Sequence, residues 1–171
     1  ERLGHAAVPD FDLPANALLS NLIDPQAQRA GWIRWPRLRR RAAEIVETFD
    51  VRTGGTAGVA RALSGGNLQK FVIGRELAKR PRLLVVNQPT WGVDMGAAMR
   101  IRRALHELAR EGAAILVISQ DLDELMELCD RLAVLHDGEL SATRPVDGWT
   151  METLGMAMTG AAGGQAARAA Q

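Results

Sequence analysis

A short glycine-rich segment is the part of this sequence whose residues are best placed to bind an anion. It reads Leu63-Ser64-Gly65-Gly66-Asn67-Leu68-Gln69-Lys70. The residues after it predict a helix that runs to about Arg80. The glycines let the backbone approach a ligand, the helix start adds N–H groups and a partial positive charge, and Ser64 adds a hydroxyl donor. These groups suit a terminal phosphate. On its own, however, a Ser-Gly-Gly triplet more often only initiates a helix.

Further segments follow this loop in a defined order. They are the apolar run Leu83–Val86 with Asn87-Gln88-Pro89-Thr90 after it, the turn Gly92-Val93-Asp94, and Ile118-Ser119-Gln120-Asp121. In this order and spacing the sequence resembles the ATP-binding cassette (ABC) family of transporter ATPases, over roughly residues 1–160. More narrowly, it is similar to the second cassette of the fused two-cassette subunits of bacterial sugar and nucleoside importers. The segments Glu1-Arg2, Val8–Asp10 and Phe49–Arg52 are typical of that group.

The resemblance implies roles for the loop and for the turn. Ser64, Gly65, Gly66 and Asn67 would form the signature loop, with Asn67 in place of the commoner glutamine. In this family the cassettes pair head to tail, so the signature loop closes over the phosphates of an ATP that the partner cassette holds. Asp94 would belong to the D-loop and help to organise that facing site. The alternative for Asp94 is that it only caps the helix that follows.

Three positions of the chain's own nucleotide site carry amides. By resemblance, Asn87 stands at the Walker B aspartate that holds Mg²⁺-bound water, Gln88 at the catalytic glutamate and Gln120 at the switch histidine. An amide cannot take a proton as a general base does, and the loss of such a base lowers a rate by about 10²–10⁴. The resemblance therefore implies a degenerate site. The alternative is that Asn87 and Gln88 are merely residues at a strand end.

The phosphate-binding sequence G-x-x-x-x-G-K-[ST] does not occur in the 171 residues. In the family this P-loop lies upstream, so we expect the chain to be a piece that begins after it. We also expect no measurable ATP hydrolysis by the chain alone, and whether it counts as an enzyme stays open. ATP and Mg²⁺ would be bound only in the complete cassette pair.

Apolar periodicity indicates an α/β fold with a parallel sheet and crossover helices. The expected helices and strands are listed by residue range: helices over 14–23, 37–49, 97–111, 121–130 and 150–158, strands over 83–86 and 114–118, a third strand beginning at 132–135, and a hairpin turn at Asp137-Gly138. The continuous apolar runs predict that both faces of strands 83–86 and 114–118 are covered.

With the resemblance added, this becomes the C-terminal part of a P-loop NTPase core of ABC type plus an α-helical signature lobe. The expected domains are a helical lobe at 1–80, the C-terminal part of the core at 81–160, and a disordered Ala/Gly-rich tail at 161–171.

Charge and cysteine content exclude several classes of protein. The 21 basic and 20 acidic residues leave a net charge of +1, so no overall field draws the chain to nucleic acid or lipid. The single cysteine, Cys129, excludes a disulfide scaffold and is expected to fill the core, and the three histidines are too scattered to form a metal site.

One local anomaly is the segment 29–41, which has six arginines, two tryptophans and no acid. It resembles a patch for nucleic acid or anionic lipid, or it is a solvated or permease-facing surface of the helical lobe.

The resemblance implies an energy-coupling subunit of an importer for sugars or nucleosides. Its partners would be another ATP-binding cassette, integral-membrane permease subunits and, indirectly, a solute-binding protein. It would lie peripherally at the cytoplasmic face of the cell membrane. Two alternatives stay open: the head of a DNA-associated ATPase with an LSGG-type loop, and a non-catalytic regulatory module. The DNA-associated ATPase is not supported, because the sequence has no heptad run and has the uncharged Gln88 where those proteins have an acidic base.

Overall fold

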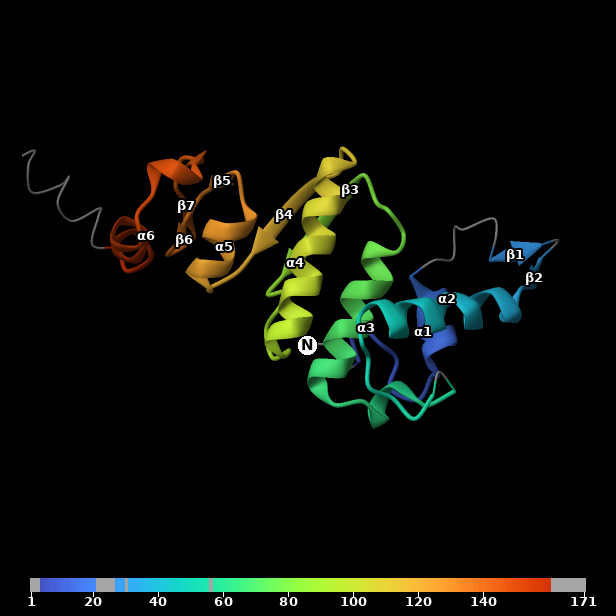
Figure 1. Ribbon diagram of the computed structural model, residues 1–171. Coiled ribbons are helices and arrows are strands. Elements are labelled where there is room, and N and C mark those ends of the chain that lie inside the picture. The colour runs from blue at the N-terminus through green and yellow to red at the C-terminus, as the bar shows by residue number, and fades with distance from the viewer. Residues whose placement is uncertain (1–3, 21–26, 30, 56, 161–171) are drawn as a thin grey trace, which may run out of the picture. The chain divides into compact units, whose positions relative to one another are not determined.

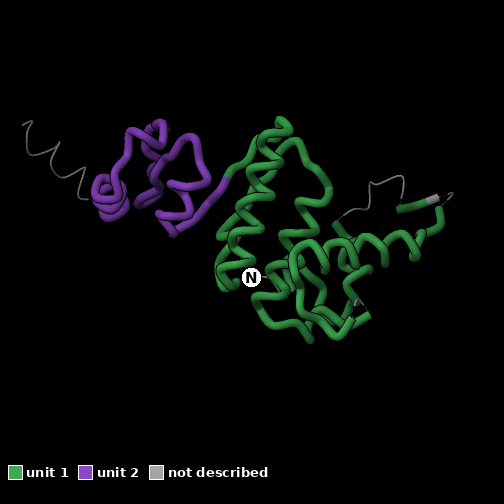
Figure 2. The backbone as a smooth tube through the Cα atoms, in the orientation of Figure 1, with its two compact units in different colours: residues 1–116 green, residues 117–171 purple. Residues whose placement is uncertain are grey.

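The computed structural model describes residues 4–20, 27–29, 31–55 and 57–160. The chain forms two compact units, residues 1–116 and residues 117–171, which Figure 2 distinguishes by colour. Each unit is described by itself below. The expected tail at 161–171 and the end of the expected helix at 14–23 lie outside the described residues.

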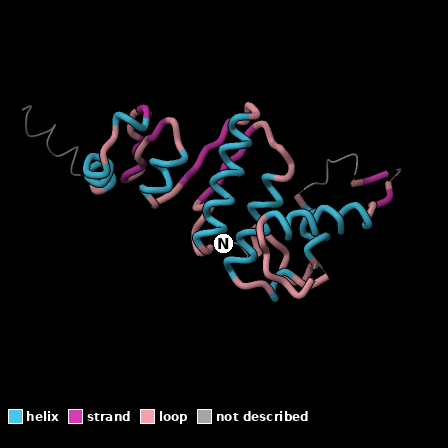
Figure 3. Tube along the Cα trace, viewed as in Figure 1, coloured by secondary structure: helices cyan, strands magenta, loops and turns pink. Residues whose placement is uncertain are grey.

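The first unit is mainly helical, as the cyan segments of Figure 3 show. Its elements are labelled in Figure 1 and have these bounds: α1 Leu13–Leu19, β1 Gln28–Arg29, β2 Trp32–Ile33, α2 Trp35–Thr48, a 3₁₀ turn at Ala60–Ala62, α3 Gly65–Leu77, β3 Leu83–Asn87, α4 Met95–Arg110 and β4 Ala114–Ile118. Strand β4 runs across the boundary into the second unit. The expected helices and both expected strands of this unit are confirmed, with ends that differ by a few residues.

Helix α3 is the centre of the first unit and packs against both α2 and α4. Helices α2 and α4 each bury one apolar stripe, which in α4 is Ile101, Leu105 and Leu108. Helix α3 instead buries residues around most of its circumference, including the polar residues Gln69 and Lys70. A helix enclosed in this way can hold the loop at its N-terminus in a fixed position.

Gly74 lets α3 and α2 approach each other closely. A Cβ atom at Gly74 would lie 2.5 Å from Phe49 Cδ2 and 2.9 Å from Ile45 Cγ2. We expect Gly74→Ala to lower the free energy of unfolding by about 1–3 kcal/mol, because the two side chains must move. Gly155→Ala in the second unit is the control: no atom lies within 4 Å there, so alanine should stabilise by up to about 1 kcal/mol. Urea unfolding measures both, and equal effects would contradict the packing argument.

Strands β3 and β4 are neighbours in a two-stranded sheet. Helix α4 connects them, and a crossover of this length is what neighbouring parallel strands need. Leu84 and Val86 of β3 are buried, but Leu83 is 66% exposed and Val85 is 57% exposed. The prediction that both faces are covered is therefore wrong for the described residues, because the helices of this unit cover one face only.

The second unit has a small core of its own. Its elements are α5 Leu122–Leu128, β5 Arg131–Leu132, β6 Leu135–His136, β7 Glu139–Leu140, β8 Arg144–Pro145, a 3₁₀ turn at Val146–Gly148 and α6 Met151–Met158. Strands β6 and β7 form the expected hairpin around Asp137 and Gly138, which both have positive φ. The expected third strand is split in two, because β5 pairs with β8 whereas β6 pairs with β7.

The core of the second unit consists of Leu132, Val134, Trp149 and Leu154. Cys129 is partly buried and packs against this cluster, and burial raises the pKa of its thiol. None of the helices within the described ranges is both long and apolar enough to cross a bilayer.

Candidate functional site

Ser64 is the N-cap of α3, with extended backbone angles (φ −63°, ψ 156°). Its Oγ accepts hydrogen bonds from the Asn67 backbone N–H (3.4 Å) and from Asn67 Nδ2 (2.9 Å). A hydroxyl has two lone pairs and one proton. Because both bonds use lone pairs, the Ser64 proton can be donated to an acceptor outside the helix.

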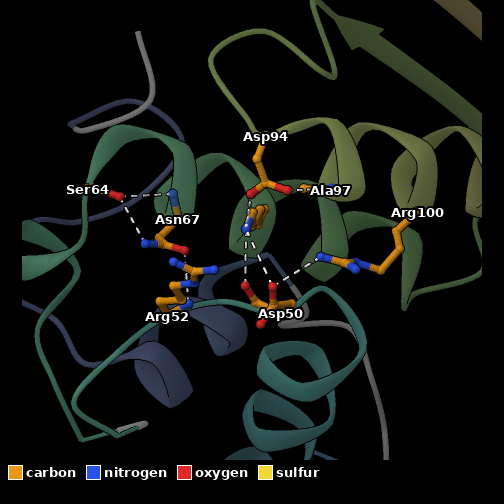
Figure 4. Close-up of polar contacts among 8 residues, drawn as sticks. Asp50, Arg52, Ser64, Asn67, Asp94, Ala97 and Arg100 are labelled. Carbon is orange, nitrogen blue, oxygen red and sulfur yellow. Dashed lines mark hydrogen bonds and ion pairs between the residues drawn. The ribbon is translucent and has the colours of Figure 1, made fainter.

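Asn67 connects the start of α3 to the loop that follows α2. Its Oδ1 accepts a hydrogen bond of 2.9 Å from the backbone N–H of Arg52, while its Nδ2 donates to Ser64, as Figure 4 shows. One amide side chain thus fixes the Ser64 hydroxyl and the loop together. The commoner glutamine, one methylene longer, would have to fold back to make the same two bonds.

Gly66 brings α3 into direct contact with the turn after β3. A Cβ atom here would lie 2.7 Å from the carbonyl oxygen of Gly92, which is closer than carbon and oxygen can approach. Gly92 itself has a φ of 73°, a conformation that favours glycine. The expected signature loop and the expected D-loop are therefore in backbone contact within one chain.

Lys70 is a buried cation beneath this contact, with an exposed fraction of 3%. Its Nζ lies 2.7 Å from Asp94 Oδ2, donates to the carbonyl oxygen of Asp50 (3.2 Å), and lies 4.0 Å from Asp50 Oδ2. Arg100 forms a second ion pair with Asp50 at 3.2 Å. A buried charge needs such partners, so Lys70 joins α3, the Asp50 loop and the start of α4.

Asp94 both caps α4 and pairs with Lys70. Its Oδ1 accepts from the Ala97 backbone N–H at 2.9 Å (Figure 4). The hydrogen bond from Lys70 and then that from Ala97 lower the pKa of Asp94 from 3.8 to about 2. Asp94 is therefore ionised at neutral pH, and the capping role considered for it is confirmed.

These residues line one pocket of about 300 Å³ at the start of α3: Arg52, Ser64, Gly66, Asn67, Lys70, Gly92, Val93 and Asp94. The pocket brings together four of the residues that the sequence singled out, Ser64, Gly66, Asn67 and Asp94. Gly65 is the first residue of α3 beside them. Because Asp94 neutralises Lys70, the start of α3 and the exposed Arg52 give the pocket its positive potential.

The chemistry of these groups suits an anion better than a cation. Ser64 can donate a hydroxyl proton, and the start of α3 adds the partial positive charge of a helix N-terminus. The carboxylate that lines the pocket, Asp94, is held by Lys70. The site therefore fits a phosphate oxygen better than Mg²⁺, because both oxygens of Asp94 are already engaged, Oδ2 by Lys70 and Oδ1 by the Ala97 N–H.

Asn87 and Gln88 lie where β3 ends, and α3 supports the backbone there. Gln69 Nε2 donates to the carbonyl oxygens of Gln88 (3.1 Å) and Pro89 (3.0 Å). Gln88 has a φ of 51°, a left-handed conformation that is strained for a residue with a Cβ. Asn87 is exposed.

Gln120 belongs to the second unit and is described with it. It is exposed and directly precedes Asp121, the N-cap of α5. Asp121 Oδ1 accepts from the Glu124 N–H at 3.0 Å, and the buried Glu124 carboxylate accepts a 2.8 Å bond from Ser119 Oγ. Among the residues that the structure describes, no group of three or more His, Cys, Asp or Glu side chains could hold a metal ion.

Sequence reasoning missed Asp50, Arg52, Gln69 and Lys70 as site residues. The available signal was the pair Gln69-Lys70, two polar residues inside an otherwise apolar stretch of α3. Its meaning depends on Asp50 and Asp94, which lie about 20 residues away on either side.

Curated relatives cover nearly all of the chain. It is 39% identical over 153 residues to the nucleoside import ATP-binding protein NupA of Lactococcus lactis subsp. cremoris, covering 90% of this chain and 30% of that protein. It is 36% identical to the guanosine import ATP-binding protein NupO of Bacillus subtilis, covering 99% of this chain and 33% of that protein. The chain thus spans about a third of the length of these relatives. No family model matches the chain.

Solved structures agree on the fold. The ATP-binding cassette MJ0796, solved as a dimer in a post-hydrolysis state with ADP and Pi, matches with a TM-score of 0.70 at 23% identity, over 86% of this chain and 62% of that one. An ATP-binding subunit of an ABC transporter matches with a TM-score of 0.72 at 20% identity, over 89% and 64% of the two chains. These matches confirm the α/β fold of the P-loop NTPase type. The chain is an ATP-binding cassette (ABC) sequence that resembles the ATP-binding proteins of sugar and nucleoside importers.

Proposed function

We propose that the chain is part of the ATP-binding subunit that couples ATP hydrolysis to the import of a sugar or nucleoside. In this proposal the pocket at the start of α3 contacts the phosphates of an ATP molecule held by a partner cassette. The geometry of Ser64 is the observation that carries it, because Asn67 fills both acceptor positions of Oγ and leaves the proton for a ligand.

The residues of the pocket would act by positioning and by electrostatics. Ser64 would donate to a phosphate oxygen, and the first turn of α3 would add N–H groups and its partial positive charge. Gly66 and Gly92 would keep that turn against the D-loop, so a shift of the D-loop at the cassette interface would move the donors. Fixed donors aimed at the oxygens of a transferring phosphoryl group would stabilise the transition state electrostatically.

The chain's own site is proposed to be degenerate. Gln88 cannot accept a proton from the attacking water, and the neutral amide of Asn87 supplies no charge to a Mg²⁺-bound water. Gln120 is proposed at the position that contacts the γ-phosphate. A partner with a complete P-loop would then supply the residues that hold ATP and Mg²⁺. This chain would supply the signature loop, Ser64–Asn67, that closes over that ATP.

The remaining assignments belong to the same proposal. Residues 1–80 would be the signature lobe and residues 81–160 the C-terminal part of the ATPase core; the compact units cut the chain elsewhere because β3 and α4 group with the helices by contact. The partners would be a second cassette, membrane permease subunits and, indirectly, a solute-binding protein. The whole would sit at the cytoplasmic face of the cell membrane.

The test compares the two sites in the assembled ATPase. We expect Ser64→Arg to lower ATP hydrolysis by about 10²-fold or more, because the guanidinium fills the pocket and the donor is lost. Gln88→Glu should leave the rate unchanged or raise it, since it alters only the degenerate site. Ala109→Arg, which adds the same charge on the exposed side of α4, is the control. Steady-state phosphate release measures all three, and full activity in Ser64→Arg would refute the proposal.

A further inference from the structure

Strand β2 and the start of α2 carry exposed apolar side chains that have no part in the pocket at the start of α3. Trp32 is 80% exposed, Ile33 is 40% exposed and Trp35 is 38% exposed. Single exposed apolar residues are common on protein surfaces, but three in four consecutive positions, two of them tryptophan, are not. We call Trp32, Ile33, Arg34, Trp35, Arg39 and Arg40 the Trp–Arg patch.

The base of the hairpin is anchored in the first unit. Ala27, just before β1, is 1% exposed and forms a small core with Leu18 and Leu38. The N–H of Arg34 donates to the carbonyl oxygen of Ala27 at 2.9 Å, and Trp32 pairs with Arg29 across the hairpin. The base of the hairpin is therefore fixed to the first unit, while Trp32 and Ile33 of β2 are exposed to solvent.

The charge of this region has one sign. Between Asp24 and Glu44 the sequence has six arginines and no acidic residue: Arg29, Arg34, Arg37, Arg39, Arg40 and Arg41. Arg34, Arg39 and Arg40 are exposed and lie at the start of α2, beside the hairpin. The chain as a whole has a net charge of only +1, so this charge is local. Its complement is a surface with a high density of negative charge.

We propose that the Trp–Arg patch binds the surface of an anionic lipid bilayer. Tryptophan prefers the boundary between headgroups and acyl chains, and arginine side chains bind the lipid phosphates there. Figure 1 shows the hairpin at the end of α2 that is remote from α3 and α4, so the tip can reach a surface before the rest of this unit does. Ile33 would enter the same boundary, while the buried side of α2 stays packed on α1.

The shape of the patch favours a membrane over nucleic acid. Proteins that bind single strands hold the backbone in a positively charged groove and stack successive bases on aromatic residues. Here Trp32 lies in the short strand β2 and Trp35 at the first turn of α2, and Figure 1 shows these elements on a protruding part of the unit, not in a groove. The proposal stands apart from the phosphate-binding role of the signature loop, because it involves none of the same residues.

The experiment is co-sedimentation of the purified protein with vesicles. We expect binding to vesicles of phosphatidylglycerol and phosphatidylcholine, and none to phosphatidylcholine alone. Arg39→Gln combined with Arg40→Gln should weaken binding about 25-fold, from about fivefold for each arginine. Trp32→Ala should weaken it about tenfold or more, because a large apolar side chain no longer leaves water. All three residues are exposed, so urea unfolding should be unchanged.

Matched controls come from elsewhere in the first unit. Trp91→Ala removes another tryptophan, 68% exposed, and Arg103→Gln with Arg110→Gln removes two exposed arginines from α4. Both should leave vesicle binding unchanged. Equal binding to neutral vesicles, equal losses in the controls, or tighter binding to a single-stranded oligonucleotide than to the anionic vesicles would each overturn the proposal.

Discussion

Replacing Gly66 by alanine is expected to lower ATP hydrolysis by the assembled protein about 100-fold, because displacing a positioning group by about 1 Å can cost that much. The added Cβ would lie 2.7 Å from the backbone oxygen of Gly92, so the first turn of α3 and the turn at 92–94 must separate. Backbone atoms cannot rotate away as a flexible side chain can. This separation would displace both the Ser64 hydroxyl and the turn at 92–94 from their present positions.

Gly96→Ala is the matched control for this prediction. Gly96 also lies in the first turn of a helix, but its Cβ would meet only Asp94 Oδ1 at 3.4 Å and Arg100 Nη1 at 3.8 Å. We expect near-normal hydrolysis from this variant. Phosphate release, measured beside a urea unfolding curve, separates a displaced loop from an unfolded one. A Gly66→Ala protein that hydrolyses ATP as fast as Gly96→Ala would show that the contact with Gly92 does not position the site.

The second large effect is expected at Lys70. Lys70→Ala should lower the free energy of unfolding by about 2–3 kcal/mol, since it removes a buried side-chain stem and a hydrogen bond to the Asp50 carbonyl. Lys70→Met keeps the stem and should cost about 1–2 kcal/mol. Lys79→Met is the control, because Lys79 is a partly exposed residue that pairs with Glu76, and such pairs contribute about 0–1 kcal/mol.

Acid titration tests the same ion pair through Asp94. Its pKa is about 2 in the folded chain and 3.8 normally, so the pair stabilises the fold above pH 4 and loses that contribution as the pH falls toward 2. Unfolding by urea at a series of pH values should show this decline in the unaltered chain and a smaller decline in Lys70→Met. An identical pH dependence in both would show that Lys70 does not set the ionisation of Asp94.

The helices could be predicted because their burial follows a local repeat. In α2 the buried positions Leu38, Ala42 and Ile45 recur every three or four residues, and the same spacing marks α4. The glycine-rich start of α3 and its cap could likewise be predicted, since Ser64 caps through a bond within four residues. Segments of this kind carry their structural information in neighbouring residues.

The third strand shows where local patterns fail. The apolar residues of 132–135 predict a single strand, but its two halves pair with different partners, β8 and β7. Arg131 and its partner Pro145 are 14 residues apart in the sequence. The apolar pattern of one segment does not determine which distant strand it pairs with. The prediction that Leu83 and Val85 are covered fails for a similar reason, because the composition of a strand does not determine what packs on each of its faces.

The sequence by itself determined the family and the order of most elements, and it singled out the glycine-rich segment at the start of α3, because motif spacing and helical periodicity are properties of neighbouring residues. The tertiary structure alone decided what holds the loop in place. Gly66 meets Gly92, Asn67 meets Arg52, and Lys70 meets Asp50 and Asp94, all across separations of 15 to 26 residues. A buried lysine and a two-glycine loop acquire their roles from charges and backbone atoms that only the packing of α3 between α2 and α4 brings within reach.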